Sequence, residues 1–340
     1  MYKITTFNFE KDNPLDKEAS TGFCDKWKKI VTDKSGRKRT IWIKIGADDW
    51  AGYYDHQSLG EVLFYLLAKD LGLDGYVLKY YPCIVNMTDN MGKKISTIGC
   101  YSYAMNSEDE VVIPLDKLNM DKVIETHCEP KLEYKDLILS LSKKTEIEVV
   151  KVRAWLDVCI LLDSIALNTD RRIANLAVIQ NTKTKKYRLA PLFDSGQTFF
   201  FKDNMLNYTE WDDLAILNNE IYSKLLVLSS TRFHDSDLMY TCFYNTEMGK
   251  KKLKQLENKQ PTNTIAAMEY FYKVLGDNSK DNEKINVYPP VTLKEVKFIK
   301  GLLRDRMETV IKHRMPGYVP SKINSYDYEV YGEYPKYFKR

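Results

Sequence analysis

The sequence predicts an α+β fold of two lobes, in which a small antiparallel sheet with one helix precedes a larger, mainly helical lobe. The chain has 340 residues, which is more than one hydrophobic core usually serves. Runs of β-branched residues are concentrated ahead of Asn106–Glu110, and helical patterns dominate after it. We therefore expect an N-terminal lobe over residues 1–105 and a C-terminal lobe over residues 106–340.

Two strand pairs frame one helix in the predicted N-terminal lobe. An Asp-Lys-Ser-Gly turn sequence at 33–36 joins the first pair into a hairpin. The helix is expected over Leu59–Leu71, because its leucines recur at helical spacing and Gly72 follows as a stop. The four predicted strands are Lys28–Thr32, Arg39–Ile45, Tyr76–Val85 and Lys93–Tyr103.

Long helices make up most of the predicted C-terminal lobe. An amphipathic stripe predicts a buried helix over Glu146–Leu167, which leads the chain into Asn168. A second helix is expected over Leu293–His313, because Thr292 and Glu295 form a capping-box pattern at its start. The other predicted segments are strands at Leu176–Ile179 and Tyr187–Leu192, a loop at Asp277–Lys284 and an extension at Ser325–Arg340.

Composition and charge exclude several classes of protein. Hydrophobic residues at 44% and charged residues at 29% are typical of globular proteins and exclude wholesale disorder. A net charge of +4 is too small to indicate nucleic acid or an anionic membrane as a partner. The longest apolar stretch, Ala154–Leu167, contains Asp157 and Asp163, so we expect no membrane helix. The N-terminus lacks a secretory pattern, and we expect a cytoplasmic protein.

Cysteines and histidines give no sign of a metal or redox centre. The six cysteines contain no Cys-x-x-Cys pair, and the four histidines are dispersed along the chain. Zinc sites and thioredoxin-type redox centres need closely spaced pairs. We therefore expect most of the cysteines to be small buried apolar residues.

Three polar side chains around a predicted hairpin indicate phosphoryl transfer. Asp170 and Asn175 have the spacing D-x-x-x-x-N, and Asp194 follows the hairpin. Phosphoryl transfer needs a carboxylate that holds the acceptor hydroxyl, together with an amide oxygen and a second carboxylate that hold magnesium. Loop Asp and Asn residues more often cap helices or form turns, so the spacing alone leaves that structural explanation open.

Two upstream residues occur in the order that the same chemistry needs. Lys44 lies in a predicted strand and Glu61 in the next helix. Protein kinases have a strand lysine that binds the ATP phosphates and a helix glutamate that orients this lysine. Each has a structural alternative, because Lys44 could face solvent from an edge strand and Glu61 could complete a capping box with Ser58. Their order ahead of Asp170 favours a nucleotide site.

Three segments carry a resemblance to a known family. Gly60–Leu73, Asn168–Asn175 and Ala190–Gly196 resemble HipA-like serine/threonine kinases, including the shorter CtkA-type proteins. The resemblance covers roughly residues 18–200 and implies a two-lobed protein-kinase-like fold with ATP and Mg²⁺ as cofactors. The implied roles are Lys44 on the ATP phosphates, Glu61 as its partner, Asp170 as catalytic base, and Asn175 and Asp194 as magnesium ligands.

A loop near the N-terminus is similar in spacing to the family's phosphate-binding loop. It runs over residues 20–26, and its Gly22 and Lys26 are candidate nucleotide ligands. Relatives autophosphorylate serines in this loop, so Ser20 and Thr21 are candidate regulatory sites here. A plain turn is the alternative explanation for the same residues.

Two more residues are assigned to the site. Tyr103, at the end of the last predicted N-lobe strand, is assigned to nucleotide binding. Arg172 stands where many relatives have a histidine, and its cation is expected to meet the γ-phosphate as a catalytic residue. A structural ion pair is the alternative for Arg172.

We expect ATP- and magnesium-dependent phosphate transfer to Ser or Thr of a protein substrate, including autophosphorylation. Two alternatives stay open. Asp170 and Arg171 also fit the D-R-x-x-x-N loop of phosphoinositide kinases, which indicates a lipid or small-molecule acceptor. The tyrosine-rich tail at 326–337 fits a nucleotide-binding pseudokinase or interaction scaffold.

The resemblance also bears on partners. Full HipA toxins carry an extra N-terminal subdomain and bind a DNA-binding antitoxin, and this chain is expected to be too short for that subdomain. An antitoxin-like or regulatory partner therefore stays open. We expect no direct contact with nucleic acid and none with a membrane.

Overall fold

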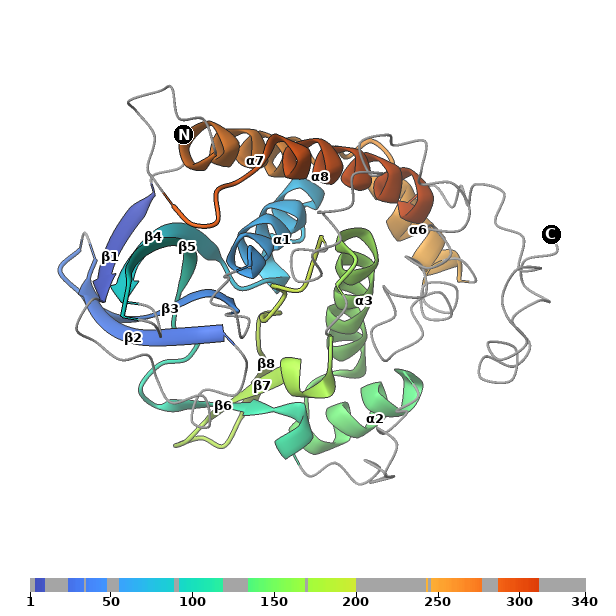
Figure 1. Ribbon diagram of the computed structural model, residues 1–340. Coiled ribbons are helices and arrows are strands. Elements are labelled where there is room, and N and C mark those ends of the chain that lie inside the picture. Colours follow the sequence, from blue (N-terminus) through green and yellow to red (C-terminus); the bar gives the residue numbers. More distant parts are fainter. Residues whose placement is uncertain are drawn as a thin grey trace, which may run out of the picture.

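The computed structural model describes residues 4–9, 24–33, 35–47, 55–88, 92–118, 134–168, 171–199, 243, 246–276 and 287–311. These ranges form a five-stranded sheet, a three-stranded sheet and the helices labelled in Figure 1. The predicted α+β class is confirmed, whereas the boundary at residue 105 stays a prediction. No described helix combines the length and hydropathy needed to cross a membrane.

The larger sheet is formed by the N-terminal strands in the order β1-β4-β5-β3-β2. β1 pairs with β4 in parallel and the other neighbours are antiparallel, so the prediction of a wholly antiparallel sheet is wrong at this edge. β1 was not predicted, because five residues far from their partner strand carry little signal of their own. The strands are β1 (Thr5–Phe9), β2 (Cys24–Thr32), β3 (Lys38–Ala47), β4 (Tyr80–Thr88) and β5 (Lys94–Tyr103).

Helix α1 (Gln57–Leu71) is buried on nearly all sides, as its mostly apolar sequence requires. It packs on β3, β4 and β5 and also contacts α3 (Val149–Ala166) and α7 (Thr262–Leu275). Figure 1 shows α1 between the sheet and these helices. The helix ends at Gly72, whose φ of 74° is left-handed, so the predicted stop is confirmed. The core is therefore continuous from the sheet through α1 to the helical half.

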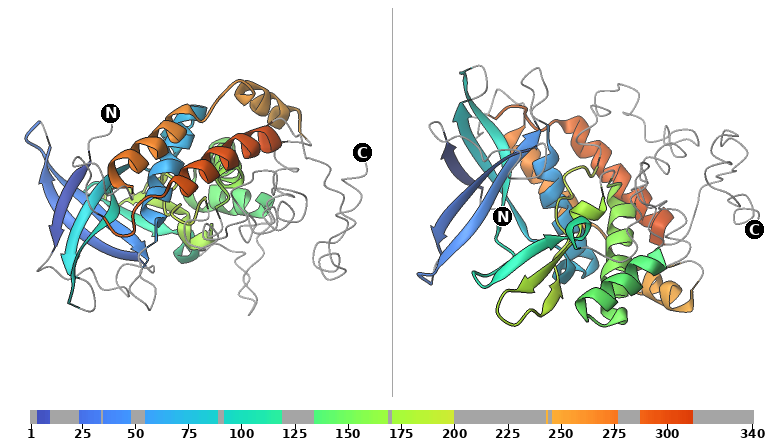
Figure 2. Two further views of the ribbon diagram at one scale, coloured as in Figure 1. Left: turned by 45° about the horizontal axis from the view of Figure 1, so that its top comes forward. Right: turned by 90° about the horizontal axis from the view of Figure 1, so that it is seen from below.

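The rest of the described chain is a small sheet and further helices. The small sheet is antiparallel in the order β6-β7-β8, and Figure 2 shows it beside α2 and α3. The elements are β6 (Glu110–Pro114), β7 (Ala177–Asn181), β8 (Tyr187–Leu189), α2 (Tyr134–Thr145), α6 (Glu247–Leu256), α8 (Leu293–Arg306), a π-helical turn at Met307–Ile311, and 3₁₀ turns at Asp74–Tyr76, Leu115–Lys117 and Ile173–Asn175.

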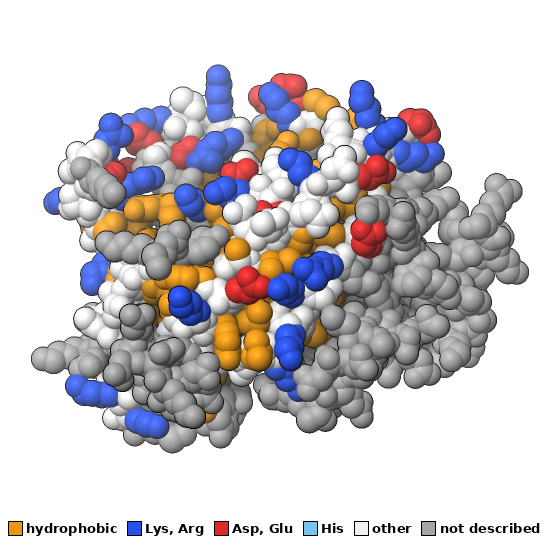
Figure 3. Space-filling view, turned by 90° about the horizontal axis from the view of Figure 1, so that it is seen from above, with side chains coloured by type: hydrophobic (Ala, Val, Ile, Leu, Met, Phe, Trp, Pro, Cys, Tyr) orange, Lys and Arg blue, Asp and Glu red, His pale blue; other side chains and the backbone are white. Residues whose placement is uncertain are grey.

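Helices α7 and α8 lie side by side over α1 (Figures 1 and 2). An ion pair between Lys300 and Glu269, 2.6 Å apart, joins them near the surface. Figure 3 shows the face on this side of the molecule, where basic and acidic side chains are mixed. The pairing across α7 and α8 is exposed and therefore contributes little to stability.

Most predicted elements are confirmed with shifted ends. β4 begins at Tyr80, not Tyr76, because a 3₁₀ turn at Asp74–Tyr76 follows α1. α3 begins at Val149, not Glu146, whose φ of 60° cannot start a right-handed helix. β6 lies where only helical pattern was expected. The loop at 277–284 and the extension at 325–340 lie outside the described residues.

Candidate active site

Lys44 lies on an inner strand and is buried. β3 has β5 on one side and β2 on the other. Because side chains alternate along a strand, Ile43 and Ile45 pack into the outer apolar cluster and Lys44 points to the opposite face, toward α1. Its side chain is 9% exposed. The edge-strand explanation for Lys44 is therefore wrong.

Glu61 supplies the buried partner of this lysine. The Lys44 ammonium donates to Glu61 Oε1 in a short ion pair, and the Ser195 backbone N–H donates to Oε2 at 2.9 Å. The Ser58 hydroxyl donates instead to the Ile98 carbonyl, 3.0 Å away, and α1 has already begun at Gln57. Glu61 therefore does not cap its own helix, and the capping-box explanation is wrong.

Asp194 completes the group around Lys44. Its Oδ1 lies 3.0 Å from the Lys44 ammonium, and its side chain is 31% exposed. Burial opposes its ionisation, but the charges of Lys44, Lys26 and Arg171 outweigh burial and lower the pKa of the carboxyl to about 2. Burial likewise opposes the charge on Lys44, but Glu61 and Asp194 outweigh it and raise the pKa of the ammonium well above its usual range. Both groups are ionised at neutral pH.

Two glycines allow α1 to approach the segment that follows Asp194. A Cβ atom at position 60 would lie 2.5 Å from the Gly196 carbonyl oxygen, and one at position 196 would lie 3.0 Å from the Gln57 carbonyl oxygen. Any larger residue at either position would push the two backbones apart. This close approach lets the Ser195 N–H reach Glu61.

Backbone contacts fix the segment that precedes Asp194. Leu192 donates to the Tyr76 carbonyl at 2.8 Å and accepts from the Leu78 N–H at 2.9 Å. The Trp155 indole N–H, from α3, donates to the Ala190 carbonyl at 2.9 Å. The segment is thus held by the chain just after α1 and by α3. Asp194 itself has a φ of 56°, a conformation that aspartate tolerates better than most residues.

Arg171 links the Asn175 loop to the Asp194 segment. Its guanidinium is held by the Asp163 carboxylate, with N···O distances of 2.9 and 3.1 Å. The same group donates to the Phe193 carbonyl at 2.7 Å and to the Asn175 carbonyl at 3.3 Å. It also donates to the Ser195 hydroxyl at 2.8 Å, and the residue is 1% exposed. Sequence reasoning missed this role, because one arginine among loop residues carries no signal of burial.

The other loop residues are only partly described. Asn175 is buried at the end of a 3₁₀ turn, and its N–H donates to the Arg172 carbonyl at 2.9 Å. Arg172 begins that turn with extended backbone and is half-buried. Asp170, the predicted catalytic base, lies outside the described residues. Gly22, Ser20 and Thr21 also lie outside them.

Lys26 is close to the group around Lys44, and Tyr103 is not. Lys26 pairs with Lys44 across the β2–β3 ladder, so the two side chains share one face of the sheet. Tyr103 pairs with Ile41, and its ring packs with the outer cluster. The Arg39 guanidinium lies 4.3 Å from that ring. The Tyr103 ring therefore lies on the face opposite Lys44, because its partner Ile41 is three positions from Lys44 along β3 and side chains alternate between faces at each position.

The arrangement suits a phosphate chain with a hard divalent cation. Magnesium in phosphate sites is usually held by one or two protein oxygens together with phosphate oxygens and water. Asp194 is ionised and partly exposed, and Arg171 holds the loop of Asn175, an amide-oxygen donor, beside it. No cluster of three His, Cys, Asp or Glu side chains in the described ranges could hold a metal ion by itself.

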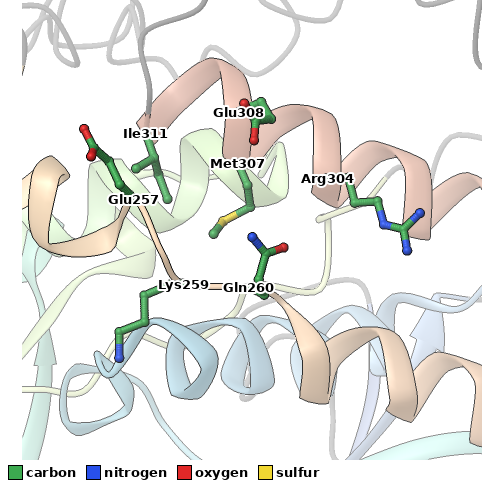
Figure 4. A pocket seen from close by; sticks show the side chains of 7 residues that line it. All are labelled: Glu257, Lys259, Gln260, Arg304, Met307, Glu308 and Ile311. Carbon is green, nitrogen blue, oxygen red and sulfur yellow. The ribbon is translucent and has the colours of Figure 1, made fainter.

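A separate cavity of about 230 Å³ lies between the α6–α7 connection and the end of α8 (Figure 4). Its lining includes Lys259, Gln260, Arg304 and Met307. Figure 4 shows these side chains around the space between the two segments. The cavity shares no residue with the group around Lys44.

Comparison with known proteins gives a fold and no sequence family. No protein-family model matches the chain, and no curated protein sequence matches it. The crystal structure of a Helicobacter pylori proinflammatory kinase, CtkA, aligns with a TM-score of 0.58 at 12% identity, over 92% of this chain and 99% of that chain. The HipA, HipB and operator DNA complex of Shewanella oneidensis MR-1 aligns at 12% identity over 88% of this chain and 66% of that chain. Its TM-score of 0.41 is too low to support an argument.

The similarity to CtkA extends over nearly the full length of both chains. At 12% identity such a similarity concerns the fold. The chain thus has the two-lobed, kinase-like fold of CtkA, and the resemblance predicted from the sequence is confirmed at the level of the fold.

Proposed function

We propose that this chain is an ATP- and magnesium-dependent phosphotransferase that acts on Ser or Thr hydroxyls of a protein and on itself. The observation that supports the proposal most is the Lys44 ammonium held between Glu61 and Asp194. Protein kinases need this lysine–glutamate pair and the metal-binding aspartate in place together. Here the three side chains meet although they come from β3, α1 and the segment after β8.

Each side chain has a role in the proposed reaction. Lys44 would bind the α- and β-phosphates, with Glu61 fixing the direction of the ammonium. Asn175 and Asp194 would hold magnesium, which neutralises charge on the phosphates when it is bound. Asp170 would accept the hydrogen bond of the acceptor hydroxyl and take its proton as the phosphoryl group is transferred. Arg172 would meet the γ-phosphate.

Two further residues belong to the proposed nucleotide site. Lys26 pairs with Lys44 across the β2–β3 ladder and lies on the same face of the sheet, so its ammonium would also bind the phosphate chain. Gly22 would bring backbone N–H groups to the same phosphates. We leave the Tyr103 ring out of the site because it packs on the opposite face of the sheet.

The test is phosphate transfer from γ-labelled ATP by the purified chain. Asp194→Ala and Asp170→Ala are expected to lower labelling of the chain and of a generic protein substrate by about a hundredfold or more. Asp109→Ala, a change at an exposed aspartate whose carboxylate pairs with Lys183, serves as the matched control and is expected to label like the parent. Near-parent labelling by either site variant would overturn the assignment of roles.

The same assay separates the two other functions that the sequence left open. Transfer to phosphoinositide vesicles in preference to protein would favour a lipid acceptor, as the D-R-x-x-x-N spacing of Asp170, Arg171 and Asn175 allows. Stabilisation by ATP and magnesium without any transfer would favour a pseudokinase. An antitoxin-like or regulatory partner stays a prediction from the family resemblance alone.

A further inference from the structure

The helix that carries Glu61 is tied to α8 at its N-terminus. His56 is the N-cap residue of α1, and its side chain makes no capping hydrogen bond. Instead its Nδ1 lies 2.5 Å from Glu295 Oε1, and its Nε2 lies 3.1 Å from the Pro289 carbonyl oxygen. Both ring nitrogens face acceptors, and only the doubly protonated imidazolium can donate to both. The buried His56 therefore joins the start of α1 to the start of α8 through a charged contact.

Glu295 is itself held in place, so it offers His56 a fixed point. Its Oε2 accepts from the Thr292 N–H at 2.6 Å and from the Thr292 hydroxyl at 2.8 Å. The Thr292 Oγ1 accepts in turn from the Glu295 N–H at 3.1 Å, which completes a capping box. One carboxylate thus caps α8 with one oxygen and holds α1 with the other.

The opposite end of α8 is tied to α3. Arg306 is 3% exposed, and its Nε donates to the Ser164 carbonyl at 2.9 Å, with a second donation from Nη2. Ser164 lies in the last turn of α3, where carbonyl groups lack helical partners. α3 then leads through Asn168 into the loop of Asn175. Helix α8, 14 residues long, therefore connects α1 with the helix that delivers the catalytic loop.

The C-terminal end of α1 is held by α7. The Asp70 carboxylate accepts from the Asn263 and Thr264 backbone N–H groups, each at 3.0 Å. It also accepts from the Thr264 hydroxyl at 2.7 Å. Asp70 thus caps the N-terminus of α7 from another helix, where a negative charge is favoured. Any rotation of α1 that withdraws Glu61 from Lys44 must strain the contacts at both of its ends.

We propose that α7 and α8 act as a built-in clamp on the active site, with His56, Glu295, Arg306 and Asp70 as positioning residues. The clamp holds α1 and α3 so that Glu61, Lys44 and Asp194 stay assembled before nucleotide binds. The inference rests on the proposed function for its consequence, because the clamped side chains are the proposed nucleotide ligands. The geometry of these ligands would then be set by α7 and α8, the C-terminal helices of the same chain.

The test compares His56→Leu with the parent by hydrogen–deuterium exchange and by calorimetry with a non-hydrolysable ATP analogue and MgCl₂. Leucine keeps a buried side chain and leaves the capping box of α8 intact. We expect exchange in α1 to become about ten- to hundredfold faster, the range given by losing one hydrogen bond to a charged group. Exchange in α2, which the clamp does not touch, is expected to stay unchanged, and affinity for the analogue is expected to fall about tenfold.

Glu269→Gln is the matched control, because it removes a carboxylate that pairs with α8 without touching α1. It is expected to behave like the parent in both measurements. If His56→Leu does not fold, His56→Gln, which keeps one donor toward Glu295, replaces it with a smaller expected effect. Unchanged exchange in α1, or equal acceleration in α1 and α2, would overturn the clamp. A parent chain that binds no analogue would refute the proposed function, and the contrast between α1 and α2 would still decide the clamp.

Discussion

Gly60→Ala tests whether the contact between α1 and the Asp194 segment controls the site. In an exposed helix interior, replacing glycine by alanine stabilises by about 0.8–1 kcal/mol. At position 60 the new Cβ would lie 2.5 Å from the Gly196 carbonyl oxygen and 3.0 Å from the Thr198 Oγ1. Ordinary contacts of this kind are 3.4 Å or longer, so the two backbones must separate by 3.4 − 2.5, or 0.9 Å. The substitution therefore has two opposite effects: alanine favours the helix, and its Cβ atom clashes with the Asp194 segment.

The separation acts on a hydrogen bond of the site. The Ser195 N–H donates to Glu61 Oε2 at 2.9 Å, and a shift of this size along that direction would lengthen the bond to about 3.8 Å, beyond hydrogen-bonding range. Losing a hydrogen bond to a charged group costs about 1.5–3 kcal/mol, and overpacking costs about 1–3 kcal/mol. After the gain in propensity is subtracted from the sum of these two losses, we expect Gly60→Ala to lower the free energy of unfolding by roughly 1.5–5 kcal/mol.

The assay is urea unfolding together with affinity for an ATP analogue and magnesium. Gly75→Ala is the matched control, because a Cβ atom there meets nothing within 4 Å. It is expected to leave stability and affinity close to those of the parent. A Gly60→Ala chain with parent-like affinity and equal or greater stability would show that the close approach does not set the position of Glu61.

Three more changes follow from the same contacts. Arg171→Met leaves the buried Asp163 carboxylate without its cationic partner, so the free energy of unfolding measured in urea is expected to fall by about 3–5 kcal/mol. A decrease below about 1 kcal/mol would contradict the proposed link. Lys44→Met leaves the Glu61 and Asp194 carboxylates without the cation that lies between them, so we expect loss of ATP-analogue binding and a lower free energy of unfolding in urea; parent-like binding of the analogue would count against it. Burial lowers the pKa of His56, but Glu295, the Pro289 carbonyl and Asp55 outweigh burial and raise it. The stability due to the imidazolium is therefore complete below about pH 6.5 and is lost as pH rises through the folded-state pKa; urea unfolding of His56→Gln, which never carries this charge, should lack that decline.

The site residues that lie on or next to regular helices and strands could be predicted from the sequence. Lys44 was found from its place in a predicted strand and Glu61 from its place in the next helix, and the fold brings both to one point. Asp194 was found from its place after a hairpin, and it meets them. These positions were predictable because the period of a strand or helix fixes the direction of a side chain.

Contacts between distant elements were not predictable in the same way. The Tyr103 assignment used only proximity along the chain to the lobe boundary, and the register of β3 with β5 puts its ring on the other face. The sequence placed Arg171 only in a D-R-x-x-x-N spacing, and its burial against Asp163, which lies on α3, reveals the link it makes. The parallel pairing of β1 with β4 could not be predicted from local sequence either, since it depends on which edge of the sheet remains free.

Two glutamates show why local patterns can mislead. Glu61 follows Ser58, and Glu295 follows Thr292, by the same three positions. At Thr292 the backbone is extended and the helix begins afterwards, so a capping box forms. At Ser58 the helix has already started, and the carboxylate is left for Lys44 and Ser195. Even the true capping box hides a distant contact, because a carboxylate has two oxygens and the second one of Glu295 holds His56. A local motif therefore accounts for one oxygen, and only the fold determines what the other one binds.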